Sequence, residues 1–265
     1  MSVGQIDRQL AREIAAAYMK ARNDLAAALQ QAFERLPADP TPAQIRGLLS
    51  QLSLLDGIDA RLDELARALD DFLTDALTNV TRLSVDDIAR EVTRLAVQAG
   101  LDVAVPLLAI DPLLELTVAP VIEQIPGLMA ALKAELRMTL RTSLARGDRM
   151  EAISRALYGR GKDRGAFQRH LTSARLMAHR AVSEAENGAR QLWLEDAKQN
   201  LPQLKKQARA KLDGKTSDVC EDVHEQVREL DEPFVLSGNG RLSSRKQTPP
   251  FHWGPCRTVI TGYLG

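Results

Sequence analysis

Apolar residues recur every three or four positions through most of the first hundred residues of this chain. This spacing places them on one side of an α-helix and forms a stripe that another element must cover. The first stripe consists of Ile6, Leu10, Ile14, Leu25, Leu29 and Phe33. It predicts a helix that ends near Pro37 and Pro40, because proline cannot continue a helix. We expect such stripes to form an intramolecular core, although a stripe left exposed would be a docking surface.

Two further helices are predicted before residue 100. Thr41 has the position of an N-cap, with Pro42 first in the helix and Gln44 placed to complete a capping box. This helix is expected to continue through a second stripe, formed by Ile58, Leu62, Leu65, Leu69, Phe72 and Leu77. Ser84 then predicts the start of a third helix, which runs to Gly100.

Composition agrees with a mainly helical protein. Only 4% of the 265 residues are aromatic, and turn-forming residues are sparse before Leu201-Pro202. Residues 101–132 are the most apolar stretch, but four prolines interrupt it, so we expect short packed helices there and no membrane span. The first twenty residues mix charged with apolar positions and do not resemble a signal peptide. The chain is therefore expected to begin in a cytoplasm.

The last sixty residues have a different character. Turn signals occur at Asp213-Gly214 and at residues 237–240, and residues 233–236 and 258–261 can form short strands. We expect a multi-helical N-terminal region and a helical body closed by a small C-terminal β-hairpin or short sheet. Trp193, Phe251 and Trp253 are expected to pack this tail onto the helices.

Both cysteines of the chain and two of its four histidines lie in this tail. If residues 217–228 are helical, Cys220 and His224 lie four apart on one face, and His252 and Cys256 have the same spacing. Two cysteines and two histidines can close around one tetrahedral zinc ion, which would make a structural site with no open position.

Two alternatives remain for this Cys/His cluster. Cys220 and Cys256 can form a disulfide, which is unusual in a cytosol but persists in oxidising surroundings, or they can be two packed thiols. A catalytic cysteine fits poorly, because neither cysteine has a base with an orienting partner nearby in the sequence. Whichever of the two linkages exists, zinc or disulfide, we expect the two cysteines to lie within side-chain reach, since a tail with a thin core needs a tie.

The residues around this cluster follow a known frame. Thr216-Ser217-Asp218-Val219-Cys220, and later Pro249-Pro250-Phe251-His252-Trp253-Gly254-Pro255-Cys256-Arg257-Thr258, resemble the phage minor head protein family, the phage Mu F-like head morphogenesis proteins. Their usual pattern is D-x-x-T-C-x-x-C, a spacer, then P-P-x-H-P-x-C-R-C. Ser217 and Thr258 stand where the family has two more cysteines, and one extra residue separates His252 from Cys256.

Two upstream blocks extend the resemblance over residues 140 to 260. Residues 175–188 are similar to the family helix R-L-A-R-T-E-x-x-R-A-x-N-A, with Ala178, Ala185 and Asn187 in step. Residues 146–157 are similar to R-G-x-S-x-x-x-I-A-x-x-L. The resemblance implies a structural protein of the virion that acts in procapsid assembly and DNA packaging or delivery. The implied partners are the portal protein and the scaffold or major capsid protein, in the capsid interior or at the portal vertex.

Charge is distributed unevenly, although the net charge is zero. Residues 1–135 carry a net charge of −8 and residues 136–265 carry +8. We therefore predict an acidic helical region, 1–135, that contacts the portal or another partner, and a basic head-morphogenesis-like domain, 136–265, that includes the Cys/His tail. The basic candidates for binding a partner or nucleic acid are Arg137, Arg141, Arg146, Arg149, Arg155, Arg160, Arg164 and Arg169. They could meet packaged DNA, an acidic portal face or a neighbouring copy, or simply pair locally on a solvated face.

Enzyme motifs such as a P-loop, a G-x-S-x-G elbow and H-E-x-x-H are missing, so no catalytic residue is assigned and no enzyme is expected. The alternative function is a DNA-binding or ejection protein of the virion that uses residues 137–180. A third class, an enzyme on a family-like scaffold, would require a metal site with an open coordination position.

Overall fold

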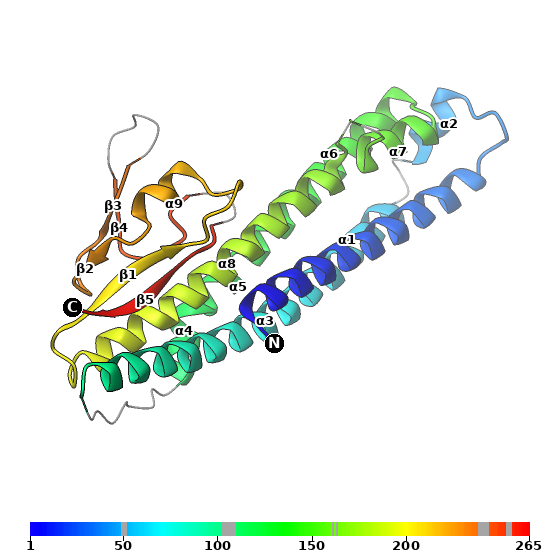
Figure 1. Cartoon of the computed structure of the whole chain (residues 1–265). Helices are drawn as coiled ribbons and strands as arrows, with labels where there is room; N and C mark the ends of the chain where they lie inside the picture. Colours follow the sequence, from blue (N-terminus) through cyan, green and yellow to red (C-terminus); the bar gives the residue numbers. More distant parts are fainter. Residues whose placement is uncertain (49–51, 102–109, 161, 163, 238–243, 253–255) are drawn as a thin grey trace. The chain divides into compact units, whose positions relative to one another are not determined.

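The structure is a computed structural model of the whole chain, and it describes all residues except 49–51, 102–109, 161, 163, 238–243 and 253–255. The described helices are α1 (Val3–Glu34), α2 (Pro42–Gly47), α3 (Leu52–Gln98), α4 (Ile110–Thr117), α5 (Ala119–Ile122), α6 (Ile125–Arg146), α7 (Met150–Tyr158), α8 (Ala166–Ala197) and α9 (Asp218–Val223) (Figure 1). The described strands are β1 (Leu204–Ala210), β2 (Val227–Arg228), β3 (Phe234–Leu236), β4 (Ser244–Lys246) and β5 (Thr258–Leu264). The predicted class, mainly α-helical with a small C-terminal sheet, is confirmed.

Contacts divide the chain into two compact units. Unit 1 consists of Met1–Gln9, Thr74–Val121 and Leu176–Gly265, and unit 2 consists of Leu10–Leu73 and Ile122–Arg175. Packing does not follow the predicted boundary between residues 135 and 136, because each unit takes residues from both sides of it. That boundary rests on charge and motif content, and as a division of function it stays a prediction.

The helix predictions near the N-terminus are confirmed in part. α1 ends at Glu34, before the two prolines. The Thr41 N–H donates to Gln44 Oε1 at 2.8 Å and Thr41 Oγ1 accepts the Gln44 N–H at 3.4 Å, so the capping box is present. α2 nevertheless stops at Gly47, and the second stripe belongs to the separate helix α3.

The helix start predicted at Ser84 is wrong, because α3 runs unbroken from Leu52 to Gln98. Ser84 is fully buried inside α3, and its Oγ donates to the Val80 carbonyl at 2.8 Å. A serine hydroxyl bonded to the carbonyl four residues earlier is satisfied within a helix and needs no role as an N-cap. The predicted end is correct, since Gly100 has a φ of 73° and its N–H donates to the Val97 carbonyl.

Unit 2 has a helical core. Along α6, Leu132, Leu136, Leu140 and Leu144 recur at four-residue steps and are each at most 1% exposed. α6 ends at Gly147, whose φ of 75° is left-handed. A Cβ at Gly147 would lie 2.6 Å from the Pro42 Cβ, so only glycine allows this cap and the approach of α2 together.

The apolar stretch before and within α6 forms a longer apolar helical segment than the prolines led us to expect. By length and composition, the helical stretch Pro112–Arg146 is apolar enough to cross a membrane, although the prolines predict no such stretch. One such helix is weak evidence for a span, because the core helix of a globular unit passes the same test. The four leucines of α6 have this core role in unit 2.

Unit 1 packs the later parts of α3 and α8 against a three-stranded antiparallel sheet of order β2-β1-β5. β1 pairs with β5 from Leu204↔Leu264 to Ala210↔Thr258, and Figure 1 shows β5 running along α8. Trp193 and Phe251 are both buried in this core, as predicted. Trp253 and the predicted turn at residues 238–240 lie outside the described residues.

β1 is the central strand and was not predicted, whereas β3 and β5 confirm the two predicted strand segments. The sequence of β1, Leu-Lys-Lys-Gln-Ala-Arg-Ala, lacks the alternation of apolar and polar residues that is typical of a strand. The reason is Lys206, which is fully buried and donates through Nζ to the Leu230 carbonyl at 2.9 Å and the Gln247 carbonyl at 3.1 Å. Nζ also lies 5.2 Å from the centre of the Phe234 ring. Burial lowers the pKa of Lys206 to about 8.

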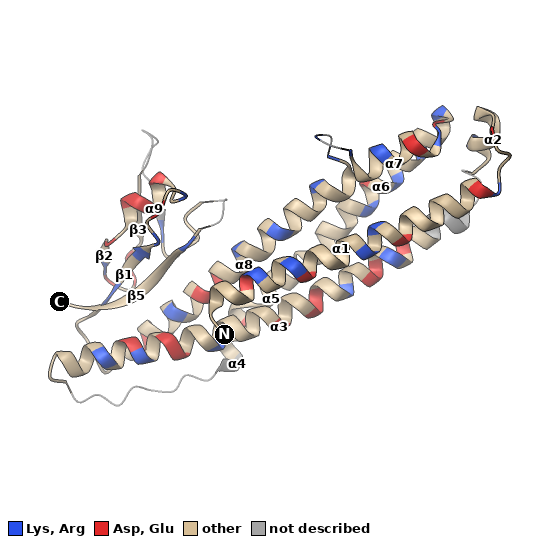
Figure 2. Ribbon diagram, turned by 45° about the vertical axis from the view of Figure 1, so that its right-hand side comes forward, with Lys and Arg blue, Asp and Glu red and all other residues tan. Residues whose placement is uncertain are grey.

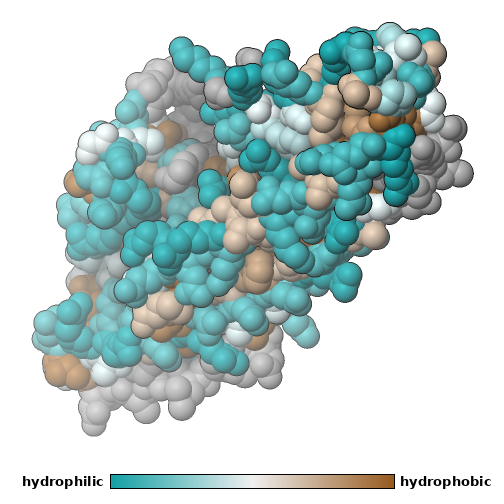
Figure 3. All heavy atoms as spheres, turned by 90° about the vertical axis from the view of Figure 1, so that its right-hand side faces the viewer, coloured by the Kyte–Doolittle hydropathy of each residue, from teal (hydrophilic) through white to brown (hydrophobic). Residues whose placement is uncertain are grey.

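Charged residues and hydrophilic surface can be followed in two views of the molecule. In Figure 2, basic and acidic residues are mixed along α1 and α3. Figure 3 shows a face covered mainly by hydrophilic residues, with small separate hydrophobic areas between them. Scattered apolar groups of this kind are normal on folded proteins and do not by themselves mark an interface.

Candidate metal centre

Three of the four predicted ligands come together in unit 1. The Sγ atoms of Cys220, in α9, and Cys256, just before β5, are 3.7 Å apart. The ligand atoms of Cys220, His252 and Cys256 all lie within 4.8 Å of one another. Both cysteines are free thiols and at most 4% exposed. The prediction that the two cysteines lie within side-chain reach is confirmed, and this Cys-His-Cys group could hold a metal ion.

The loop before Cys220 is held by short-range hydrogen bonds. Thr216 Oγ1 donates to the Lys211 carbonyl at 2.6 Å and accepts the Asp213 N–H at 2.8 Å. Ser217 is the N-cap of α9, where its Oγ accepts the Cys220 N–H at 3.4 Å. Ser217 stands where the family pattern has a cysteine, and here it starts the helix that carries the first sulfur ligand.

An ion pair ties this loop to the start of β5. The two terminal nitrogens of Arg257 each donate to one oxygen of Asp213 at 2.6 Å. This bidentate bond holds the pKa of the Asp213 carboxyl well below its usual range. Because Arg257 adjoins Cys256, this ion pair holds the two cysteine segments together without a metal ion.

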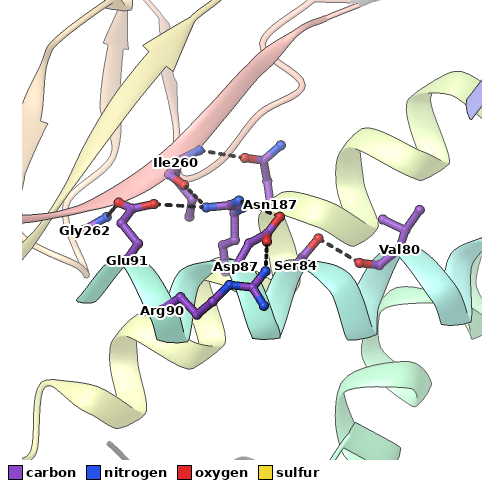
Figure 4. A network of polar contacts seen from close by, with 9 residues as sticks. Val80, Ser84, Asp87, Arg90, Glu91, Asn187, Ile260 and Gly262 are labelled. Atoms are coloured by element: carbon purple, nitrogen blue, oxygen red, sulfur yellow. Dashed lines mark hydrogen bonds and ion pairs between the residues drawn. The ribbon is translucent and has the colours of Figure 1, made fainter. Parts of the chain in front are cut away.

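Asn187 of α8 holds the other side of β5 (Figure 4). Its Nδ2 donates to the Thr258 carbonyl at 3.3 Å. Its Oδ1 accepts the Ile260 N–H at 2.8 Å. An amide side chain thus takes the place of a neighbouring strand along an edge that would otherwise leave backbone groups unpaired. This contact gives a physical role to the asparagine of the family-like helix.

Arg190 and Glu91 continue this edge. Arg190 Nη1 donates to the Ile260 carbonyl at 3.3 Å and lies 3.5 Å from Glu91 Oε2. Glu91 Oε1 accepts the Gly262 N–H at 2.9 Å (Figure 4). Burial raises the pKa of Glu91, although Arg190 acts in the opposite direction. Side chains of α3 and α8 therefore satisfy four backbone groups of β5 that β1 leaves free.

His224, the fourth predicted ligand, is not part of the group. The predicted helix over residues 217–228 is wrong, because α9 ends at Val223 and Glu225 has a φ of 65°. The chain turns there to pair with β1: the Glu225 N–H donates to the Ala208 carbonyl, and the Ala210 N–H donates to His224 Nδ1 at 3.1 Å. Sheet pairing therefore overrides the helical spacing, and the described residues offer three ligands where four were predicted.

The two sulfurs influence each other's protonation. Their hydrogen bond lowers the pKa of Cys256 and raises that of Cys220. Loss of a first proton from Cys256 is favoured because the Cys220 thiol stabilises the thiolate. A thiolate is the form of cysteine that binds a metal ion.

A histidine and aspartate pair near the cysteines was missed. His179 Nδ1 lies 2.8 Å from Asp7 Oδ2, and this hydrogen bond raises the pKa of His179 against the effect of burial, with a smaller contribution from Cys256. His179 Nε2 is buried and has no hydrogen-bond partner among the described residues. Cys256 is therefore not hydrogen-bonded to this histidine, as an activated nucleophile would be to its base. No local signal could have revealed a pair separated by 172 positions.

Five of the eight candidate arginines form ion pairs within unit 2. Arg137 pairs with Asp59, Arg149 with Asp39, Arg155 and Arg160 with Glu151, and Arg169 with Glu135. Arg141, Arg146 and Arg164 form no ion pair with the described residues. The exposed pairs contribute little stability, but they reduce the positive charge available to a nucleic acid. A contact with DNA stays a prediction.

Comparisons with protein-family models, with curated proteins and with solved structures found no match for this chain. The chain's own geometry defines its class. It is a mainly helical protein with a small antiparallel sheet, and the segments beside that sheet carry a Cys-His-Cys group that could hold a metal ion.

Proposed function

We propose that this chain is a structural protein of a phage head, of the minor head or head morphogenesis kind, that acts in procapsid assembly and in DNA packaging or delivery. One observation carries the proposal: residues of the family-like blocks that lie far apart in the sequence contact one another in unit 1. Asn187 holds β5, and Cys220 meets Cys256 and His252. Chance matches to separate short motifs would have no reason to make these contacts.

The same proposal includes a zinc ion as a structural tie. Two thiolates at about 2.3 Å from a tetrahedral zinc are roughly 3.8 Å apart, and the two sulfurs are 3.7 Å apart. His252 would supply the third ligand. A cavity of about 10 Å³ beside Cys220 and His252 is large enough for one water, which would complete the four ligands.

A structural role is favoured over catalysis. His179, the histidine near the cysteines, bonds to Asp7 and makes no hydrogen bond to Cys256. Cys220, His252 and Cys256 bring α9 together with the segment before β5, which is how a structural metal site acts. The DNA-binding alternative is less favoured, because most of the candidate arginines already pair with carboxylates. The proposed partners are the portal protein and the scaffold or major capsid protein. The proposed location is the portal vertex or capsid interior, after assembly in the host cytoplasm.

Co-expression with the portal protein of the same genome tests the proposal. We expect the tagged chain to retain the portal protein through purification, and imaging to place it on the portal ring. An unrelated oligomeric protein of the expression host, carried through the same purification, is the control for nonspecific capture. Failure to retain portal, scaffold and capsid proteins alike, with a folded chain, would show that the proposed function is wrong.

A further inference from the structure

A small pocket in unit 2 has the features of a binding site. It has a volume of about 200 Å³ and is lined by Tyr18, Met19, Arg22, Tyr158, Phe167 and Gln168, among others. Small-molecule sites usually occupy roughly 300–1,000 Å³. The pocket is therefore suited to a single large side chain, which is how a partner protein commonly anchors itself.

Aromatic rings form the inner part of this pocket. Tyr18 is 2% exposed and Phe167 is 4% exposed. The rings of Tyr158 and Phe167 have their centres 5.9 Å apart and are tilted by 38°. At the rim, Met19 is 43% exposed, and methionine adapts its shape readily to a bound group. An aromatic ligand would find favourable stacking or edge contacts here.

Two tyrosines that line this pocket have hydroxyls without a hydrogen-bond partner among the described residues. The hydroxyls of Tyr18 and Tyr158 are buried, and neither makes a hydrogen bond to any described residue. A buried tyrosine hydroxyl normally finds a partner, so two unsatisfied ones at one pocket require an explanation. Both are proton donors, because burial raises the pKa of each tyrosine.

Arg22 adds a positive charge to this pocket. Its guanidinium carbon lies 5.3 Å from the centre of the Tyr158 ring, and Nη1 is 3.7 Å from the Met19 sulfur, a weak acceptor. It makes no ion pair with the described residues, unlike its neighbour on α1, Lys20, which pairs with Glu64. Among the residues that the structure describes, no acidic one lines the pocket. The unpaired guanidinium and the two phenol hydroxyls are all donors, so the complementary group is an acceptor with negative charge.

We propose that this pocket binds an aromatic side chain that has a carboxylate beside it, presented by a partner polypeptide. The flexible side chains of Met19 and Arg22 turn aside to admit the ring, which then contacts Tyr158 and Phe167. The carboxylate pairs with Arg22 and accepts hydrogen bonds from the two tyrosines. This inference does not depend on the phage assignment or on the metal.

The full chain, labelled with ¹³C in its methionine methyl groups, provides the test. The chain has six methionines, of which Met19 lines the pocket and Met138, 64% exposed, lies outside it. The probe is N-acetyl-phenylalanine, with N-acetyl-phenylalaninamide as the neutral match. We expect the acid to shift the Met19 signal saturably, leave Met138 unchanged, and bind about fivefold more tightly than the amide, the effect of one accessible ion pair.

Three variants sharpen the result. Arg22→Gln should abolish the preference for the acid over the amide, whereas Arg12→Gln, an exposed residue of the same helix, should keep it. Tyr18→Phe should keep the fold and weaken binding of the acid. The proposal is wrong if the acid shifts Met19 no more than Met138, if the amide binds as tightly as the acid, or if Tyr18→Phe binds the acid as tightly as the unchanged chain.

Discussion

Unit 2 buries apolar side chains almost exclusively, whereas unit 1 buries many polar ones. Of the eleven buried polar or charged residues in the described chain, only Ser143 belongs to unit 2. In unit 1 several of these groups, among them Asn187, Arg190 and Lys206, bond directly to main-chain atoms. A helix satisfies its own backbone, but a three-stranded sheet leaves edges and bends that need side-chain partners. The two units should therefore respond to different perturbations.

Removal of zinc should give the largest difference between the units. If the proposed site exists, the protein should hold about one zinc per chain, and zinc at about a thousand times its Kd should stabilise unit 1 by about 4 kcal/mol. Chelation should then speed hydrogen exchange in β1, β5 and α9 and leave unit 2 protected. Acid should have the same effect, because zinc binding requires thiolates, which are lost as the pH falls.

Two substitutions make this zinc experiment specific. Cys220→Ser should lose the metal, and His224→Ala should retain it, because the His224 ring bonds to the Ala210 N–H outside the group. If a reductant loosens the same segments and a chelator does not, the tie is a disulfide. Indifference to both reagents would leave two packed thiols.

An apolar truncation should be the most damaging single change in unit 2. Leu136 is fully buried in α6, so Leu136→Ala should lower the free energy of unfolding by about 3 kcal/mol through lost burial and the resulting cavity. Met138→Ala, two positions away and 64% exposed, should change it by less than about 0.5 kcal/mol. Chemical denaturation measures both values. Equal effects would contradict the apolar core described for unit 2.

Truncation of a buried polar side chain should lower the free energy of unfolding nearly as much as Leu136→Ala does, but only in unit 1. Asn187→Ala leaves the Thr258 carbonyl and the Ile260 N–H buried without their side-chain partner, at a cost of about 2 kcal/mol. Hydrogen exchange should rise first at β5. Asn200→Ala, the same change at an exposed residue, is the control. A stability equal to that of the unchanged protein would show that Asn187 does not support the strand edge.

The pH dependence of Lys206 should be the smallest of these effects. Its pKa is lowered to about 8 in the folded state, whereas an unfolded lysine has a pKa of about 10.4. Between about pH 8 and 10 the unfolded chain therefore keeps a proton on Lys206 that the folded chain has lost, and stability rises with pH. Relative to Lys206→Met, the unchanged protein should gain about 1 kcal/mol between about pH 7 and 9. Thermal unfolding across this range measures the difference. Parallel curves for the two proteins would mean that Lys206 keeps an ordinary pKa.

The helical part of the fold could be predicted because its signals are local. The apolar stripe of α1 and the capping box at Thr41 depend on residues at most four positions apart. Ser84 shows where such reasoning fails. A serine before acidic residues resembles an N-cap, but its hydroxyl bonds equally well to the carbonyl of Val80 inside a continuous helix.

Patterns within the sequence predict the helical class, the two C-terminal strands and the meeting of Cys220 with Cys256. The central position of β1, the turn of His224 toward the sheet and the assembly of each unit from distant segments depend on how the whole chain folds. Lys206 shows the physical reason. From the sequence, a lysine is expected to be exposed to solvent. In the folded chain, Lys206 is instead surrounded by the carbonyls of Leu230 and Gln247 and by the ring of Phe234, which distant segments bring to it.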